Sequence, residues 1–234
     1  MAGNFNLEQN NSYASGMEAK IAANSAALES GDAVKLASGF VAMAGAGDTI
    51  EGISVTKKTF ASDNQTVAMD KAIYHPSDIN DQYRMRLFGA TALEFSGDLV
   101  TSNTINLKVN GVAMTQVTFS GDNATTLGLI ATQLETDFPT VIESALAVGA
   151  SDKVLITVVP WQTVTLSEIV VAAGAGQATG SQVDNFAQAD IGDFYDIKAT
   201  TQFVDGDTNH ASSGQLKFEE VLSQSFGIFS IANT

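Results

Sequence analysis

The sequence predicts a mainly β protein: a compact β-barrel formed by N- and C-terminal segments and interrupted by an inserted small α+β domain with one helix. Two stretches far apart in the chain, residues 31–60 and 191–231, share short apolar alternation that is broken by glycine turns. The segment between them changes character and contains one helical pattern. An insertion is tolerated where the two ends of a loop lie close together, so a barrel interrupted at one loop is physically ordinary.

This pattern divides the chain into four parts. In order, they are an N-terminal arm, the first part of the barrel, the inserted domain and the second part of the barrel: residues 1–28, 29–97, 98–180 and 181–234. The 234 residues are enough to bury a full core without disulfides or metal. Because 44% of the residues are hydrophobic and only 16% are charged, we expect a folded protein.

Charge and cysteine content exclude several classes of function. The 26 Asp and Glu outnumber the 11 Lys and Arg, and the net charge of −15 repels phosphate backbones, so we expect no nucleic-acid partner. The absence of cysteine excludes thiol catalysis, thiolate zinc sites and disulfides. No stretch reads as a signal peptide, and no run approaches the ~18 apolar residues of a membrane span, so we expect no membrane partner.

The N-terminal arm is polar and then alanine-rich. Residues 1–15 are rich in Asn and Ser, and residues 17–28 form a weakly helical stretch with few large apolar side chains. Chain ends commonly fray, so one interpretation gives the arm no role. The other interpretation is an arm that becomes ordered on a partner.

In the first part of the barrel, apolar and polar residues alternate over short stretches that are typical of β-strands. Apolar residues recur with largely period-2 spacing from Gly31 to about Phe95. Turn signals occur at residues 45–47 and 62–64. Strands this short need a closed barrel or a sandwich to protect their edges.

The inserted domain opens with a β-hairpin and continues with a helix. Alternation over residues 105–109 leads into Asn110 and Gly111, the preferred pair of a type I′ turn. Residues 126–138 then show helical spacing, with Asp122 or Asn123 as the N-cap.

Further strands are expected after the helix. They cover residues 141–146, 153–159 and 164–171, which gives a sheet with one helix on one face. The Gly-, Ala- and Gln-rich residues 174–188 read as a linker that returns the chain to the barrel, with Gly97 and Asp98 at the other junction.

Two histidines are too few and too isolated for the usual metal or hydrolase sites. His75 precedes Pro76 and is expected in a loop, and His210 has no other histidine at ligand spacing. The chain has no Gly-x-Ser-x-Gly. The spacing of Asp205, Asp207 and Asn209 starts like a calcium loop, but the glycine and glutamate that the loop needs are missing, so we expect a hairpin turn.

The remaining candidates for chemistry also favour structural roles. The glycine runs at residues 45–48 and 174–180 read as turns and not as phosphate-binding loops. Glu219 and Glu220 are adjacent on an expected strand, so their side chains point to opposite faces and do not flank one bond. We therefore assign no catalytic, cofactor-binding or metal-binding residue, and we expect a non-enzymatic protein without a cofactor.

Trp161 has two interpretations. Following Pro160 in an expected loop, it either caps the small core of the inserted domain, which we favour, or is exposed and stacks on a sugar or anchors a partner. Phe226, Phe229 and Ile231 are expected to close the barrel core.

Three segments carry a resemblance to a known family. Residues 31–36, 48–53 and 214–231 resemble the barrel of tailed-bacteriophage capsid cement, or decoration, proteins. The insert, with residues 103–107, the turn at Asn110 and Gly111 and the helical stretch, is similar to a module recurrent in phage virion proteins. A minimal cement barrel lacks this insert.

The resemblance implies a virion structural protein without enzymatic activity. Such a protein is made in the host cytoplasm, binds the outer capsid surface, bridges major capsid protein subunits and stabilises the capsid, often as a homotrimer or other homo-oligomer. On this view the barrel docks on the capsid, the arm orders along a neighbouring subunit and residues 99–178 project outward. The alternative is a tail or fibre receptor-binding module that recognises host glycans through the insert, with Trp161 as the stacking surface. A hydrolytic virion enzyme is a third, weaker interpretation.

Overall fold

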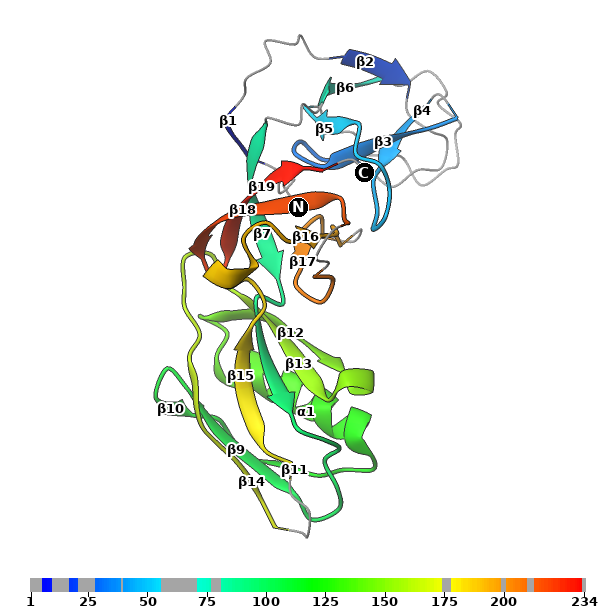
Figure 1. Ribbon diagram of the computed structural model, residues 1–234. Helices are drawn as coiled ribbons and strands as arrows, with labels where there is room; N and C mark the ends of the chain where they lie inside the picture. The colour runs from blue at the N-terminus through cyan, green and yellow to red at the C-terminus, as the bar shows by residue number, and fades with distance from the viewer. Residues whose placement is uncertain are drawn as a thin grey trace. The chain divides into compact units, whose positions relative to one another are not determined.

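A computed structural model describes most of the chain. The described residues are 6–9, 17–20, 28–38, 40–55, 71–76, 81–173, 178–198, 201–209 and 213–232. They form a mainly β structure with one α-helix and a nearly closed, barrel-like sheet, as the sequence predicts (Figure 1). The mainly β fold class with one helix is therefore confirmed.

The chain forms two compact units. Unit 1 contains Met1–Arg86, Asp190–Glu220 and Gly227–Thr234, so it is built from both ends of the sequence. Unit 2 contains Leu87–Ala189 and Val221–Phe226. Unit 2 thus includes the whole predicted insert together with flanking residues and the turn of a C-terminal hairpin.

One sheet of unit 1 combines strands from both ends of the chain. Its order is β1-β7-β19-β18-β16, and β17 also pairs with β7. The bounds are β1 Asn6–Gln9, β7 Gln82–Phe88, β16 Phe194–Tyr195, β17 Val204–Asp205, β18 Leu216–Ser223 and β19 Phe226–Ile231. Strands β7, β18 and β19 each have residues in both units.

The second sheet of unit 1 comes from the N-terminal half alone. Its order is β2-β6-β5-β3-β4, and β2 also approaches β4. The bounds are β2 Met17–Lys20, β3 Ala33–Ala37, β4 Phe40–Met43, β5 Gly52–Ser54 and β6 Lys71–Pro76. This approach of the outer strands gives the sheet its barrel-like form.

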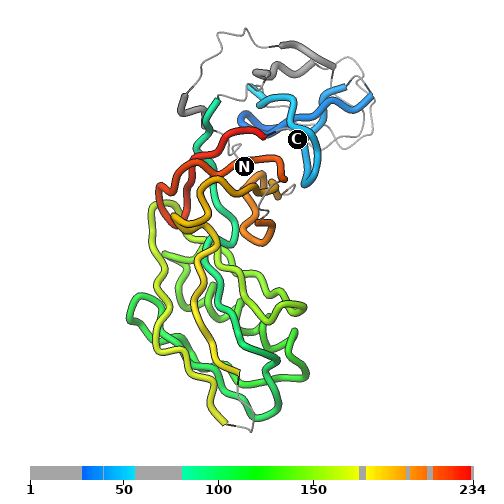
Figure 2. Tube along the Cα trace, viewed as in Figure 1, coloured from blue at the N-terminus to red at the C-terminus, as the bar shows by residue number. Residues whose placement is uncertain are grey.

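Two buried glutamines join the N- and C-terminal parts of unit 1. Gln202 accepts the Ala33 N–H at 3.0 Å and donates to the Ala44 carbonyl at 2.9 Å. Gln215 donates to the Gly45 carbonyl at 2.7 Å. Figure 2 shows the blue segment of residues 28–55 and the orange-red segment of residues 213–232 side by side in this unit.

An aromatic cluster fills the C-terminal part of unit 1. Tyr195, Phe218 and Phe229 are fully buried. The rings of Phe218 and Phe229 stack with centroids 5.0 Å apart, and Tyr195 meets both edge-on. Phe229 and Ile231 are therefore core residues, as predicted, whereas Phe226 lies outside this core in unit 2.

Unit 2 packs one helix and two sheets around a shared apolar core. One sheet has the order β12-β13-β8-β15; in the other, β9 pairs with β10 and β11 on one side and with β14 on the other. The bounds are β8 Thr91–Phe95, β9 Thr104–Val109, β10 Val112–Ala113, β11 Val117–Thr118, α1 Asn123–Asp137, β12 Ile142–Val148, β13 Lys153–Val158, β14 Leu166–Ala172 and β15 Gly180–Asp184. Short 3-10 turns occur at Gly149–Ser151 and Gln188–Asp190.

The predicted hairpin and helix are both confirmed. Asn110 and Gly111 have φ angles of 51° and 82°, as a type I′ turn requires, and Val112 pairs with Val109. Helix α1 is capped by Asp122, whose side chain accepts the Thr125 N–H at 2.7 Å.

The burial of α1 follows the sequence pattern. Leu127, Ile130 and Leu134 are completely buried, and the helix packs on β12 and β13 (Figure 1). The strands predicted after the helix appear as β12, β13 and β14. Local periodicity was a sufficient signal here because each of these elements has a clear apolar face.

Three local predictions were wrong. Met17–Lys20 is a strand paired with β6 and not part of a helix, because sheet pairing overrides a weak local propensity. His75 lies in β6 and not in a loop, with Pro76 at the strand end, where proline is tolerated. The predicted linker contains β15, a half-exposed strand whose mixed pattern carries little periodic signal.

Two predictions fall on other parts of the chain. The turn at residues 62–64 and the position of His210 lie outside the described residues.

Candidate functional site

The most unusual surface feature of unit 2 is Trp161. It lies in the β13–β14 loop with 60% of its surface exposed, so the favoured core-capping interpretation was wrong. Its φ angle is +63°, a left-handed conformation that bulky residues rarely adopt. Backbone strain of this kind persists only where the surroundings hold it, and it often marks functional sites.

The β18–β19 turn holds Trp161 in place. The backbone N–H of Trp161 donates to the Ser225 Oγ at 2.9 Å, and Ser225 is fully buried. The indole ring also packs on the Phe226 ring, with centroids 4.6 Å apart and a tilt of 32°. Backbone and ring are thus fixed by two neighbouring residues of one turn.

Two further side chains fix the rest of the loop. The Gln224 amide pairs with both backbone groups of Val164: its Oε1 accepts the N–H at 2.6 Å and its Nε2 donates to the carbonyl at 3.0 Å. Asn110 donates to the Thr163 carbonyl and accepts the Thr165 N–H, each at 2.8 Å. The loop is therefore a preorganised platform, which we call the Trp161 platform: residues 160–163 with Ser225 and Phe226.

Sequence reasoning found Trp161 but not its supports. Gln224 and Ser225 lie far from the loop in sequence, and nothing in their local pattern indicates that they contact it. Phe226 was assigned to the barrel core because its apolar run is continuous with Phe229. A contact between distant turns leaves no periodic signal.

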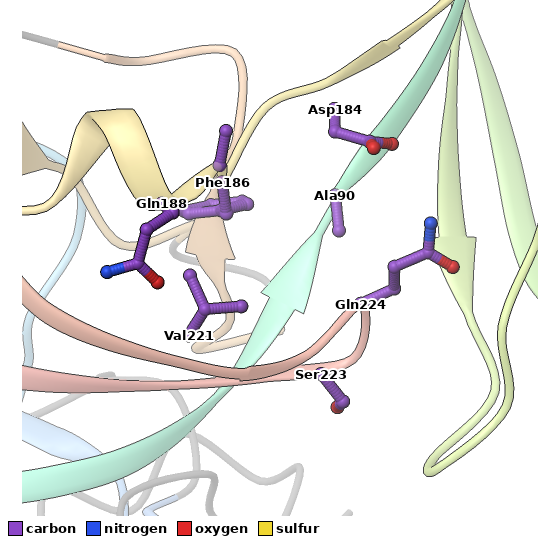
Figure 3. Close-up of a pocket in the computed structure, with 8 residues that line it drawn as sticks. Ala90, Asp184, Phe186, Gln188, Val221, Ser223 and Gln224 are labelled. Atoms are coloured by element: carbon purple, nitrogen blue, oxygen red, sulfur yellow. The ribbon is translucent and has the colours of Figure 1, made fainter.

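Unit 2 also has a small cavity of about 310 Å³. Figure 3 shows its lining: apolar side chains at Ala90, Phe186 and Val221, and polar ones at Asp184 and Gln224. The Asp184 Oδ1 accepts hydrogen bonds from neighbouring side chains at 3.1 and 2.9 Å. Ser223 also lines the cavity, and its Oγ accepts the backbone N–H groups of Ser225 and Phe226, each at 3.2 Å.

Hydrogen bonds from backbone N–H groups lower the pKa of Asp122 and of Asp137 in unit 2, and two further carboxyl groups with shifted pKa values lie in turns of unit 1. Burial raises the pKa of Asp32, and the hydrogen bond from the Glu29 N–H offsets this only in part. Burial also acts to raise the pKa of Asp48, but hydrogen bonds from Lys35 and the Gly45 N–H, both at 2.7 Å, hold it below its usual value. Both groups order backbone turns, so their shifts do not indicate a catalytic pair.

The calcium-like spacing lies in a turn, as predicted. The Thr208 N–H donates to the Asp205 carbonyl at 3.1 Å, and the Asp207 N–H donates to the Asp205 Oδ1 at 3.1 Å. Among the described residues, no group of three or more His, Cys, Asp or Glu side chains is arranged to hold a metal.

The acidic pair on β18 does not converge. Glu219 accepts hydrogen bonds from Ser230 at 2.7 Å and from Lys217 at 3.2 Å, whereas Glu220 is exposed.

In the described part of the chain, no helix is long and apolar enough to cross a membrane.

Fold and site together define a mainly β protein whose inserted α+β unit carries an exposed, rigidly held aromatic side chain. No protein-family model and no curated protein matches the chain. A solved chain from Mycobacterium phage Patience is similar: it is 15% identical, with a TM-score of 0.37, over 100% of this chain and 99% of that one. A likeness at this level defines neither the fold nor the function of this chain.

Proposed function

We propose that this chain is a non-enzymatic virion structural protein that decorates a bacteriophage capsid and stabilises it by bridging major capsid protein subunits. The observation that carries the proposal is the union of the two chain ends in unit 1. Of the segments that resemble cement barrels, residues 31–36, 48–53, 214–220 and 227–231 belong to this unit, and residues 221–226 belong to unit 2. Gln215 joins them directly, because it donates to the carbonyls of Gly45 and Asp48.

The surface chemistry supports a clamp more than a catalyst. A cement protein acts by burying area across a joint and by repeating weak contacts around a symmetric shell. It therefore needs complementary surface rather than activated side chains. The net charge of −15 suits docking on basic patches and keeps such a protein dispersed at high copy number.

A binding experiment with undecorated capsids tests the proposal. The purified protein is mixed with capsids, sedimented and quantified, and the temperature of capsid rupture is measured with and without it. We expect saturable occupancy and a higher rupture temperature. Failure to co-sediment, or saturation without any change in rupture, would contradict the stabilising role.

Trp161→Ala is the matched variant in this experiment. Because Trp161 lies in unit 2 and the cement-like segments lie in unit 1 apart from residues 221–226, capsid occupancy should be unchanged. Loss of occupancy would favour the interpretation of Trp161 as an anchor for a protein partner.

The N-terminal segment requires a gentler test than deletion. Residues 1–28 include β1, which pairs with β7, and β2, which pairs with β6, so their removal would take two strands from unit 1. A photo-crosslinker placed between β1 and β2 keeps both strands. If the segment lies along a neighbouring capsid subunit, crosslinks to the major capsid protein form; crosslinks only within the chain would exclude that role.

A further inference from the structure

The conformation of Trp161 costs free energy that burial of its own side chain does not offset. Left-handed backbone at a bulky residue costs on the order of 1–3 kcal/mol, and an exposed tryptophan gains little from burial in return. The hydrogen bond to Ser225 and the contact with Phe226 keep the ring in one orientation. Such an arrangement lowers the entropy that binding would otherwise cost.

The surroundings of the ring indicate the chemistry of a ligand. The indole ring packs on the Phe226 ring, and 60% of the surface of Trp161 is exposed. Its neighbours Gln162 and Thr163 are exposed and carry an amide and a hydroxyl, groups that exchange hydrogen bonds with sugar hydroxyls. Residues 159–165 contain no charged side chain and no second exposed large apolar one; on the β9–β10 hairpin, whose Asn110 is bonded to this loop, Val112 is exposed.

We infer that the Trp161 platform binds a neutral saccharide, with one sugar ring stacked on the outward face of the indole. A flat aromatic face flanked by uncharged hydrogen-bonding groups matches the alternation of C–H and hydroxyl groups on a pyranose. An apolar protein anchor would be expected to sit among other exposed apolar groups. The net charge of −15 disfavours sulfated or sialylated sugars. The inference stands independently of capsid decoration.

Fluorescence provides a site-specific readout because Trp161 is the single tryptophan of the chain. The intact protein is titrated with maltotriose, cellotriose, chitotriose and mannotriose, and it is screened in parallel on a glycan array that includes sialylated and sulfated sugars. We expect a saturable change in Trp161 emission with at least one neutral saccharide, and array binding confined to neutral glycans.

Three variants identify the platform as the site. Trp161→Ala should abolish array binding, while Leu129→Ala, which alters an exposed residue of helix α1, should leave it unchanged. Ser225→Ala keeps the ring but removes the acceptor of the Trp161 N–H, so it should weaken binding by about tenfold. Circular dichroism checks that each variant is folded, and the wild-type titration does not depend on any variant.

Any of three results would overturn the inference. One is the absence of any saccharide-dependent change in emission together with a blank array. Another is glycan binding that survives Trp161→Ala. If Trp161 emission shifts only when capsids are added, and Trp161→Ala lowers occupancy, the platform is a protein anchor and the saccharide assignment is wrong. If the protein binds capsids but no saccharide, the saccharide inference is wrong and the proposed function still stands.

Discussion

A single buried side chain, Gln215, connects distant backbone segments of unit 1 by hydrogen bonds. Gln215 is 5% exposed and satisfies three backbone groups: it accepts the Ile197 N–H and donates to the carbonyls of Gly45 and Asp48. Buried backbone groups without partners are costly, so one side chain here serves several turns. No sequence pattern reveals this role, because a buried glutamine and an exposed one look alike in a single chain.

Gln215→Ala should destabilise the protein. Truncation leaves the Ile197 N–H and the Asp48 carbonyl without this partner, whereas the Gly45 carbonyl still accepts the Asp48 N–H at 3.1 Å. We expect the free energy of unfolding to fall by roughly 3 kcal/mol. Urea denaturation measures the change. Gln162→Ala, at an exposed position, is the control and should stay within about 0.5 kcal/mol of the wild type. Equal effects of the two substitutions would contradict the role given to Gln215.

Asp32 makes stability depend on pH. Its pKa is raised, chiefly by burial, so the native state holds the proton more tightly than the unfolded chain does. The stability that this proton provides is present below the unfolded-state pKa and is lost as pH rises through the folded-state pKa. At neutral pH, the ionised Asp32 therefore weakens the fold.

Asp32→Asn removes the charge and keeps an oxygen that can accept the Glu29 N–H. We expect this variant to be more stable than the wild type at pH 7, and the difference to vanish below about pH 3, where the wild-type carboxyl is neutral. Thermal unfolding across this pH range measures it. A variant less stable at pH 7 than the wild type would show that the carboxylate is needed in its charged form.

Strands, turns and helices were predictable from the sequence where their backbone geometry restricts which residues can occupy a position. The pair Asn110 and Gly111 predicts its turn because both positions require positive φ. Helix α1 was predictable because its apolar face and its Asp122 cap coincide. β15 and β2 were missed, since half-exposed or outer strands depend on their partners more than on their own pattern.

Gly111→Ala isolates the backbone requirement of the β9–β10 turn. The added methyl group would meet no atom within 4 Å, so the cost arises from φ = +82° alone. We expect a loss of about 1 kcal/mol in the free energy of unfolding. Gly97→Ala is the matched control, because its methyl group also meets nothing within 4 Å and its φ is not left-handed. A comparable loss at Gly97 would contradict the assignment of the cost to the left-handed backbone of Gly111.

The whole molecule has two compact units, and their boundaries lie at other residues than those that the sequence pattern suggests. Distant segments with one pattern indicated a unit built from both chain ends, which the structure has. Unit 2, however, begins before residue 98 and ends after residue 180, because β8 and β15 complete one of its sheets. Both strands pair with residues far away in sequence, so a local composition change is a poor guide to such a boundary.

Fragments of unit 2 test where it ends. A fragment of residues 98–180 lacks β8 and most of β15, which leaves β13 paired only with β12, and we expect no cooperative unfolding transition. A fragment of residues 87–189 keeps both sheets and should unfold cooperatively. Circular dichroism during heating distinguishes the two. Cooperative unfolding of the shorter fragment would show that β8 and β15 are dispensable.

Cryo-electron microscopy of the particles with which this protein co-purifies would test the proposed capsid decoration without any variant. We expect density on the outer shell at or near symmetry axes, in contact with more than one major capsid subunit. Density confined to the tail, or none on any particle, would contradict capsid decoration.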